Sequence, residues 1–433
     1  MTNFQGHPAR SAPWTQDGPR VPISRTGAGA AAANGASTAA TGAGKRRLVG
    51  VDAARGLALI GMISIHIMPS WDPVTFEPTA QWTVFAGRSA ALFALLAGVG
   101  LAFSTGGRTP HTGRAMTADR VGVVVRAVLI AGLGLAINGV IPGDTIDEVP
   151  AVNILVYYGV YFLLAIPFLS LSARALFAWA GCFALAGPVL MHVLREALPG
   201  FERHNPVLGD LLTAPAATAA QLLLTGTFPA LPYLAYLLAG LALGRLDLGQ
   251  TQVQVRLVVG GVALAAAAWV VSWVLIQQAG GFEQLVARTP GLDEELVNDI
   301  IVWGPEPALP TTTWWWLAVA GPYTNTPLAL LLGLGSATAV LGLCLLLARG
   351  AGRWLLPLSA MGSMTLTVYS AHLLGLSAEV HYDQPMWFLI HVGVGLVFAL
   401  LWHQVLGQGP LERVVAGIVR AVRRLVLGRQ PQT

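Results

Sequence analysis

The chain has 433 residues, of which 55% are hydrophobic and only 11% are charged. Because a soluble protein of this size carries about a quarter charged residues, the composition excludes an ordinary soluble domain. Several apolar runs of about 20 residues, each long enough to cross a bilayer, instead predict an all-α polytopic membrane helical bundle. We expect the lipid bilayer of the plasma membrane as its surroundings and no nucleic acid as a partner. The sequence leaves the oligomeric state open.

The two ends of the chain differ from this pattern. Residues 1–44 are rich in Ala, Gly, Ser, Thr and Pro. Such a segment cannot bury a core, so we predict a disordered cytoplasmic tail, and it has no apolar stretch of the kind found in signal peptides. A transmembrane domain is predicted over 45–409. Over 410–433, arginines placed among Val, Ile and Leu predict a cytoplasmic amphipathic basic tail.

Hydropathy predicts about ten transmembrane helices. The predicted spans cover 48–69, 83–104, 119–141, 152–171, 174–194, 228–246, 254–278, 326–348, 354–375 and 386–408. Basic residues occupy one alternate set of connecting loops, and acidic residues concentrate in the other. Because Lys45, Arg46 and Arg47 precede the first span, the positive-inside rule predicts that both termini are cytoplasmic.

The first span contains three ionisable residues, which are costly inside a membrane and therefore rare. Arg55 and His66 are eleven residues apart, about three helical turns, so they lie on nearly the same face and about 16 Å apart along the axis. Asp52 is three residues before Arg55 and joins the same stripe. The Asp52–Arg55 pair has two interpretations, a structural ion pair near the inner end or part of a functional site.

Other polar side chains inside the predicted spans fall into two layers. The inner layer contains Asp52, Arg55 and Arg126, and the outer layer contains His66, Arg88, Asn138, Asn153, Tyr369, Ser370, His372 and His391. Taken singly, an arginine can snorkel to the headgroups and a histidine can bond a neighbouring helix. Gathered at one depth, the outer groups predict a cavity. A neutral histidine there can act as a general base, and Asn or Ser can stabilise an oxyanion, which suits acyl transfer.

Metal chemistry is not predicted. The two cysteines, Cys182 and Cys344, lie in separate predicted spans, and their spacing matches neither a metal site nor a disulfide framework. We interpret both as small buried hydrophobic residues.

The first-span pattern Arg46-x5-Asp52-x2-Arg55-Gly56-x-Ala58, followed by His66, resembles the signature of the membrane acyltransferase superfamily. That superfamily includes heparan-α-glucosaminide N-acetyltransferase-like proteins and bacterial surface-polysaccharide O-acyltransferases. In the O-acyltransferase branch an arginine and a histidine separated by ten residues form the catalytic signature. Arg55 and His66 match that pair, whereas the heparan branch usually has asparagine at the position of His66.

Further segments resemble the bacterial YeiB-like group of this superfamily. They are Gly87–Gly98 in the second predicted span, Ile154–Val160 in the fourth, Met361-Gly362-x-Met364-x-Leu366-Thr367-x-Tyr369 in the ninth, and Gly409-Pro410-Leu411-Glu412 near the end. Together with the first-span signature, they extend the resemblance over nearly the whole chain beyond the N-terminal tail.

The resemblance implies a membrane acyltransferase that takes an acyl group from cytoplasmic acyl-CoA, such as acetyl-CoA. The acceptor would be a hydroxyl or amine of an envelope glycan or glycolipid on the outer face. The implied catalytic residues are His66, Arg55 and Asp52, and the implied substrate-binding residues are Arg88, Asn138, Asn153, Arg126, Tyr369, Ser370 and His372.

One departure from the family narrows the expected mechanism. The heparan enzyme carries an acyl-accepting histidine in the outer loop after its first span, but residues 70–82 contain no histidine. Two expectations remain, direct transfer with His66 as the base or a protein that has kept the fold without the activity. The alternative is a transporter or exporter of a small solute or lipid, in which the Asp52–Arg55 pair forms a gate and the histidines relay protons.

Overall fold

The computed structural model describes residues 48–142, 149–306, 308–378 and 383–428. In these ranges the chain is helical, and no strand forms beyond an isolated bridge between Trp71 and Pro78. In lipid, an apolar segment can satisfy its backbone N–H and C=O groups only within a helix or a closed barrel. The all-α prediction is confirmed. The predicted tail at 1–44, the basic leader at 45–47 and the last five residues lie outside the described part.

Seven helices in the described part are long and apolar enough to cross a membrane, so the chain is a multi-pass membrane protein. They are α1 (Val49–Ile67), α2 (Ala80–Phe85) continued by α3 (Arg88–Ser104), α4 (Gly113–Asn138), α6 (Ala173–Leu194), α10 (Thr251–Trp273) continued by η3 (Val274–Gln278), α13 (Pro327–Gly350) and α16 (Gln384–Leu406).

Three predicted spans form shorter or broken helices, because hydropathy registers apolar content but not breaks in the helix. The fourth is α5 (Leu155–Ala165) with η1 (Ile166–Phe168). The sixth is α9 (Ala230–Gly244), which is bent by 49° from the preceding α8 (Pro215–Ala220) and η2 (Gln221–Thr225). The ninth is divided into α14 (Leu356–Gly362) and α15 (Thr365–Leu376). The ten-span topology and the cytoplasmic position of the termini stay predictions.

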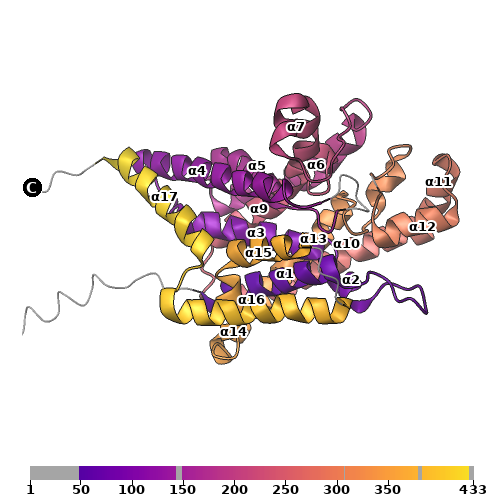
Figure 1. Cartoon of the computed structure of the whole chain (residues 1–433). Coiled ribbons are helices and arrows are strands. Elements are labelled where there is room, and N and C mark those ends of the chain that lie inside the picture. Colours follow the sequence, from indigo (N-terminus) through magenta and orange to yellow (C-terminus); the bar gives the residue numbers. More distant parts are fainter. Residues whose placement is uncertain (1–47, 143–148, 307, 379–382, 429–433) are drawn as a thin grey trace, which may run out of the picture. The chain divides into compact units, whose positions relative to one another are not determined.

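The remaining helices lie outside the candidate spans. They are α7 (Leu208–Thr213), α11 (Gly281–Arg288), α12 (Glu294–Trp303), η4 (Trp314–Ala318) and α17 (Pro410–Leu427). The helices α11, α12 and η4 share a small core around Trp316, which is fully buried. The helix α17 begins where the amphipathic tail was predicted, and it packs on α4 through Val419 and Arg423, which contact Gly122 (Figure 1).

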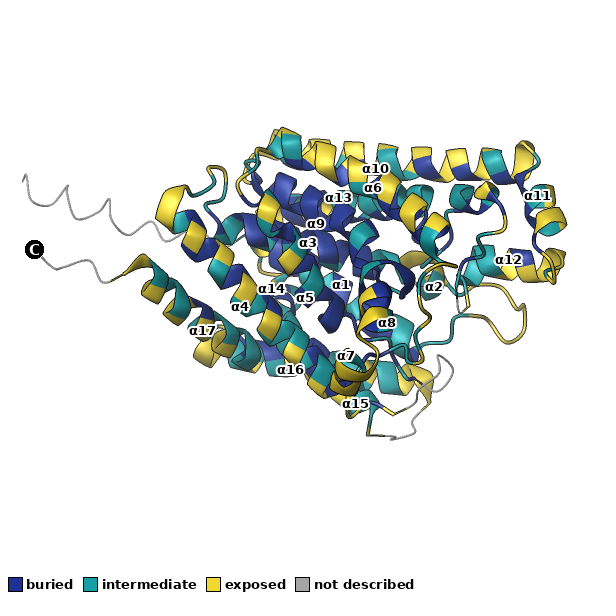
Figure 2. Ribbon diagram, turned by 90° about the horizontal axis from the view of Figure 1, so that it is seen from above, coloured by how far each residue is buried: buried dark blue, intermediate teal, exposed yellow. Residues whose placement is uncertain are grey.

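Helix α1 lies in the interior of the bundle, and α10 and α16 lie at its edges. Within the most apolar eighteen residues of each helix, 72% are buried in α1 but only 11% in α16. Figure 2 shows α1, α3 and α9 in the buried centre, while α10 and α16 present exposed faces. Large apolar side chains such as Leu389 and Leu401 cover the exposed face of α16. Such a face is stable against lipid and unfavourable in water.

Helix α14 crosses α1 at very close range, because glycines face each other across the contact. A Cβ atom at Gly56 of α1 would collide with the carbonyl oxygen of Leu358, and one at Gly362 would collide with that of Asp52. Close backbone approach through small residues is a common way for membrane helices to associate. This crossing fixes α14, and α15 follows α14 after a break of two residues.

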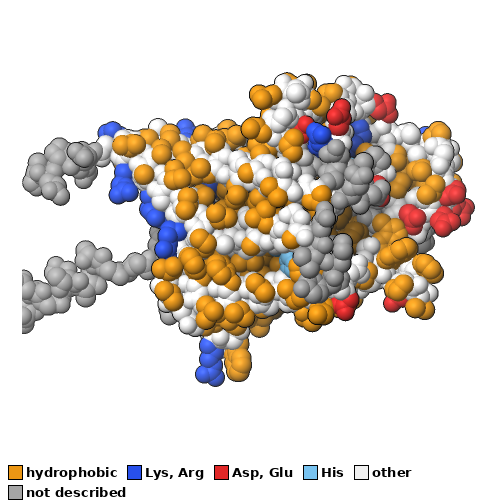
Figure 3. Space-filling view, in the orientation of Figure 1, with side chains coloured by type: hydrophobic (Ala, Val, Ile, Leu, Met, Phe, Trp, Pro, Cys, Tyr) orange, Lys and Arg blue, Asp and Glu red, His pale blue; other side chains and the backbone are white. Residues whose placement is uncertain are grey.

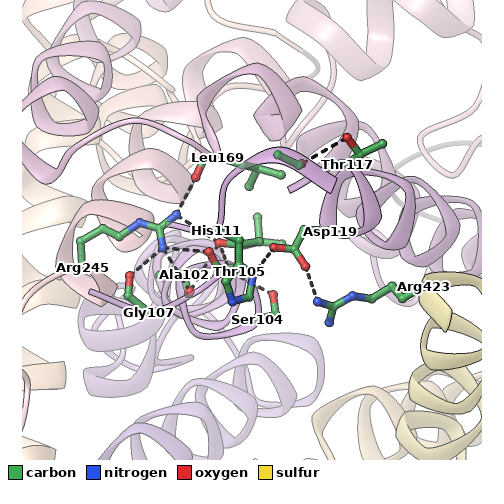
Figure 4. A network of polar contacts seen from close by, with 12 residues as sticks. Ala102, Ser104, Thr105, Gly107, His111, Thr117, Asp119, Leu169, Arg245 and Arg423 are labelled. Carbon is green, nitrogen blue, oxygen red and sulfur yellow. Dashed lines mark hydrogen bonds and ion pairs between the residues drawn. The ribbon is translucent and has the colours of Figure 1, made fainter. Parts of the chain in front are cut away.

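A polar network joins the ends of several helices on the side where α17 lies (Figure 4). Arg245, directly after α9, is buried and donates to the backbone oxygens of Gly107 and Leu169, both at 2.6 Å. It also donates to Thr105 Oγ1 at 3.1 Å. Burial lowers the pKa of Arg245, and nearby Asp119 opposes this shift. A guanidinium held by several oxygens ties α9 to the ends of α3 and η1.

Asp119 of α4 forms the second half of this network. Its carboxylate contacts His111 Nδ1 at 2.6 Å and pairs with Arg423 of α17 (Figure 4). The sequence placed Asp119 at the start of a predicted span and gave no indication of either partner.

Charged side chains lie at opposite ends of the face shown in Figure 3. Basic side chains gather where α17 lies, acidic ones gather beside α11 and α12, and hydrophobic side chains cover the area between them. The acidic group includes Glu294 and Glu295 in the first turn of α12. This separation agrees with the alternation of charge that the sequence predicted.

We expect Gly56→Ala to destabilise the protein by about 1–3 kcal/mol, because the added methyl group must push α14 away from α1. Gly132→Ala is the matched control, since a Cβ atom at Gly132 of α4 meets no atom within 4 Å. The measurement is the thermal unfolding midpoint of the detergent-purified variants. Equal midpoints for the two variants would show that the α1–α14 crossing tolerates separation.

Candidate functional site

The inner part of the candidate site is the ion pair near the start of α1. Arg55 Nη1 lies 3.1 Å from Asp52 Oδ1, and Asp52 is buried. Arg55 Nη2 also donates to the backbone oxygen of Leu96 in α3 at 3.4 Å. The predicted pairing of Asp52 with Arg55 is confirmed, and it stabilises a guanidinium that would be costly alone in a membrane helix.

Arg126 of α4 adds a further positive charge close to this pair. The charges of Arg55 and Arg423 both act on Arg126. Arg55 is neutralised by Asp52, and Arg423 by Asp119. Arg126 forms no hydrogen bond or ion pair with any other described residue. The inner layer therefore has one guanidinium in excess, and it is available to an anion.

The outer part of the site is a row of three histidines from three helices. His66 Nδ1 of α1 lies 2.9 Å from His372 Nε2 of α15. His372 Nδ1 lies 2.7 Å from His391 Nδ1 of α16. The rings of His66 and His372 are almost parallel, at an angle of 5°. Because these nitrogens face one another, they form hydrogen bonds and do not converge on a common metal position.

The row couples the tautomers of its members, because a neutral imidazole has only one N–H group. If His66 donates through Nδ1, His372 receives at Nε2 and donates through Nδ1 to His391. His66 Nε2 is then unprotonated and is the nitrogen that can accept a proton from a substrate. The hydrogen bond made by one nitrogen of each ring sets whether the other nitrogen carries the proton. Other sites in which a partner orients a histidine base work in the same way.

Glu412 positions the helix that carries His372. Its Oε1 accepts hydrogen bonds from the backbone N–H groups of Leu366 (2.7 Å) and Thr367 (3.2 Å), and its Oε2 accepts one from Thr367 Oγ1 (2.6 Å). The first N–H groups of a helix have no partner within it, so a carboxylate from another element is an effective cap. Two of the segments used for the YeiB-like resemblance thus meet at the N-terminus of α15.

Hydroxyl groups lie between the inner and the outer parts. The ring of Tyr369 is centred 6.4 Å from that of His66, and its hydroxyl accepts a hydrogen bond from the N–H of Ile154 at 3.5 Å. Tyr158 of α5 lies within electrostatic reach of both Tyr369 and Arg55. The buried hydroxyls of Tyr158 and Ser370 have no hydrogen-bond partner in the described part of the chain. We take Tyr158, Tyr369 and Ser370 as a candidate polar column from Arg55 toward His66.

Asn138 and Asn153 lie in a separate network that fixes the segment before α5. Asn153 Nδ2 donates to Asn138 Oδ1 at 2.7 Å, and Asn138 Nδ2 donates to the backbone oxygen of Pro206 at 2.7 Å. Asn153 Oδ1 accepts the N–H of Leu155 at 3.0 Å. Both side chains are buried and have partners, so the structure gives them a supporting position. Their contact with a substrate stays a prediction.

Arg88 does not join the histidines. It begins α3, donates to the backbone oxygen of Thr83, and lines a different cavity. The predicted outer layer therefore divides into three parts, which are the histidine row with Tyr369 and Ser370, the asparagine network, and the Arg88 cavity.

These features place a row of buried histidines at one end of α1 and excess positive charge near the other, an arrangement that would suit a membrane-embedded transferase. The comparison with known families agrees with this class. Residues 47–276, more than half of the chain, match the family model of the heparan-alpha-glucosaminide N-acetyltransferase catalytic domain, so the chain belongs to that family. No curated protein matches the chain.

Membership in this family makes the protein a membrane acyltransferase. The matched segment contains Asp52, Arg55 and His66 but ends before α15 and α16. His372 and His391 therefore come from outside the matched segment, and their place beside His66 is visible only in the structure.

We expect Glu412→Ala to lower the free energy of unfolding by about 1–3 kcal/mol, because three hydrogen-bond donors lose their acceptor. Glu412→Gln keeps one acceptor oxygen and should lose less. The thermal unfolding midpoints of the two variants and the parent measure this order. An alanine variant as stable as the parent would mean that Glu412 does not hold the start of α15.

Proposed function

We propose that the protein transfers an acetyl-like acyl group from acyl-CoA to a hydroxyl or amine of an envelope glycan or glycolipid, with His66 as the general base. The observation that carries this proposal is the 2.9 Å contact between His66 Nδ1 and His372 Nε2. When His66 donates through Nδ1 in this contact, its Nε2, which has no hydrogen-bond partner in the described part of the chain, accepts the proton of the acceptor.

In this reaction His66 takes up one proton and later releases it. The acceptor oxygen or nitrogen attacks the thioester carbon, and its proton moves to His66 Nε2. The tetrahedral intermediate then collapses, the carbon–sulfur bond breaks, and the same proton passes to the departing thiolate. His372 and His391 are positioning residues, because they hold the His66 tautomer and stabilise the transient imidazolium through hydrogen bonds.

The inner layer supports the donor part of the proposal. Acyl-CoA carries phosphates, and arginine binds phosphate through paired N–H groups while it stays charged when partly buried. Arg126 has no carboxylate partner among the described residues, and Arg55 lies close enough to act on it. The column through Tyr158 and Tyr369 runs from there toward His66. In this proposal the phosphates bind at the cytoplasmic end and the acyl group reaches His66 from within.

The acceptor is proposed to arrive from the opposite side. His66 is in the last turn of α1, at the other end of that helix from Asp52. If the N-terminus is cytoplasmic, as the charge pattern predicts, His66 faces the outer leaflet. Ser370, buried near His372 and without a partner in the described part, is a candidate donor to the developing oxyanion.

The transporter alternative has two observations in its favour, the bend of 49° between η2 and α9 and the break between α14 and α15, since broken helices are typical of transporter sites. The bend lies in a different part of the bundle from the histidine row, whereas the break directly precedes the helix that carries His372. The family match supports the transferase, so we retain acyl transfer as the proposed function.

Replacing the base should abolish turnover without unfolding the protein. We expect His66→Gln to lower the rate of acetyl-CoA cleavage by about 10²–10⁴-fold, the usual contribution of a general base. The assay is release of free thiol from acetyl-CoA by the purified protein in the presence of isolated envelope glycans.

His403→Gln is the matched control, because His403 of α16 contacts the backbone oxygen of Gly407 and, among the described residues, makes no hydrogen bond to the histidine row. His391→Gln should reduce the rate less than His66→Gln and should displace the acid limb of the pH–rate profile, whereas a purely structural role would leave that limb unchanged. Equal turnover by the parent and His66→Gln would refute the mechanism.

A further inference from the structure

A cavity that the mechanism above does not use lies on the same end of the bundle as the histidine row. Its volume is about 340 Å³. It is bounded by the start of α3, the first two turns of α9 and α13, Trp269 of α10, and the loop before α13. The aromatic rings in its wall are Trp82, Tyr233, Tyr236, Trp269 and Tyr323.

The charge of this cavity comes from one side chain. Arg88 is the only charged residue among the described residues that line it. Burial raises the pKa of Tyr323 to about 12, so this phenol stays neutral at physiological pH. No carboxylate in the described part of the chain pairs with Arg88. The cavity therefore carries a net positive charge without a counter-ion.

Arg88 also retains most of its hydrogen-bonding capacity. A guanidinium has five N–H donors, and within the described part of the chain Arg88 makes one hydrogen bond, to the backbone oxygen of Thr83. As the first residue of α3, Arg88 is at the positive end of that helix. Both features favour an anion that can accept several hydrogen bonds at once, and phosphate has this geometry.

The remaining wall indicates that the anion is attached to a lipid. Arg88, Tyr233 and Ala329 lie in the first turns of their helices, the depth expected for headgroups. Leu332 and Trp269 lie deeper in the apolar part of the bundle, and the side chain of Trp269 is 56% exposed on the face of α10 that meets the lipid. The cavity thus has a polar upper part, an apolar lower part and one wall beside the bilayer. These two parts match the polar headgroup and the apolar chains of a phospholipid.

We propose that this cavity binds one anionic phospholipid from the surrounding leaflet, with its phosphate on Arg88 and its acyl chain toward Leu332 and Trp269. The site is separate from the proposed transfer chemistry and does not depend on it. Tyr323, which lines the cavity, lies within electrostatic reach of Tyr369, whose ring is beside that of His66.

The test measures binding of a defined lipid to the purified full-length protein in the absence of acyl-CoA. Native mass spectrometry counts bound phosphatidylglycerol, and thermal unfolding gives the stabilisation as the lipid concentration is raised, because a ligand that prefers the folded state stabilises it. Diacylglycerol lacks the phosphate, and glycerol phosphate and inorganic phosphate lack the chains. We expect phosphatidylglycerol to bind and the other three to bind at least about tenfold more weakly.

Arg88→Gln should weaken phosphatidylglycerol binding by about 10–100-fold, and Arg88→Lys should restore part of it. Arg349→Gln is the control, because Arg349 is at the far end of α13 and bonds the backbone oxygen of Gly249. The lipid-free unfolding midpoint of each variant reports whether it is folded.

Undiminished binding by folded Arg88→Gln would overturn the proposal, and so would equal binding of diacylglycerol. Equal binding of glycerol phosphate would show that the ligand is a soluble phosphate and would also overturn it. Failure of the acyltransferase mechanism is recognised separately, because His66→Gln should bind phosphatidylglycerol as the parent does whatever its turnover.

Discussion

An imidazole inside a membrane domain must find its hydrogen-bond partner within the protein, and His66 finds His372. The helices in the C-terminal third of the chain are arranged so that His372 reaches His66. The ninth predicted span breaks after Gly362, α14 presses against α1, and α15 starts again in a position that brings His372 to His66. Glu412 caps α15, and α16 supplies His391 as the next partner. A continuous membrane helix at 354–375 would not need this cap.

The need for a hydrogen-bond partner within the protein also explains why the two ends of α1 differ. Near its start, Asp52 neutralises Arg55 within one turn of the same helix, so that end needs little from the rest of the bundle. Near its other end, His66 depends on side chains more than 300 positions later in the chain. The family match ends at residue 276, before either partner histidine. The N-terminal half therefore provides the candidate base, and the C-terminal half provides its two histidine partners.

The sequence predicted the features that depend on local pattern. Apolar runs predicted the all-helical membrane fold, and the i, i+3 spacing predicted the Asp52–Arg55 pair, because both depend on residues close in the chain. It could not predict that Asn138 and Asn153 would bond each other while Arg88 faces a separate cavity, since equal depth in the membrane does not fix the position around the bundle. The polar network of Arg245, Asp119 and Arg423 was missed for a related reason. The positive-inside rule alone already accounts for arginines at inner helix ends and in the C-terminal tail, and the partners of Arg245 and Arg423 are distant in the chain.

The proposed mechanism requires one path that connects Arg126 to His66 and carries an acyl thioester along the polar column between them. A structure of the full chain with a non-hydrolysable acyl-CoA analogue would show whether this path exists. We expect phosphate oxygens within hydrogen-bond distance of Arg126 or Arg55, and the carbonyl carbon of the analogue beside His66 Nε2. An analogue bound elsewhere, or bound with its acyl group remote from the histidine row, would refute the mechanism.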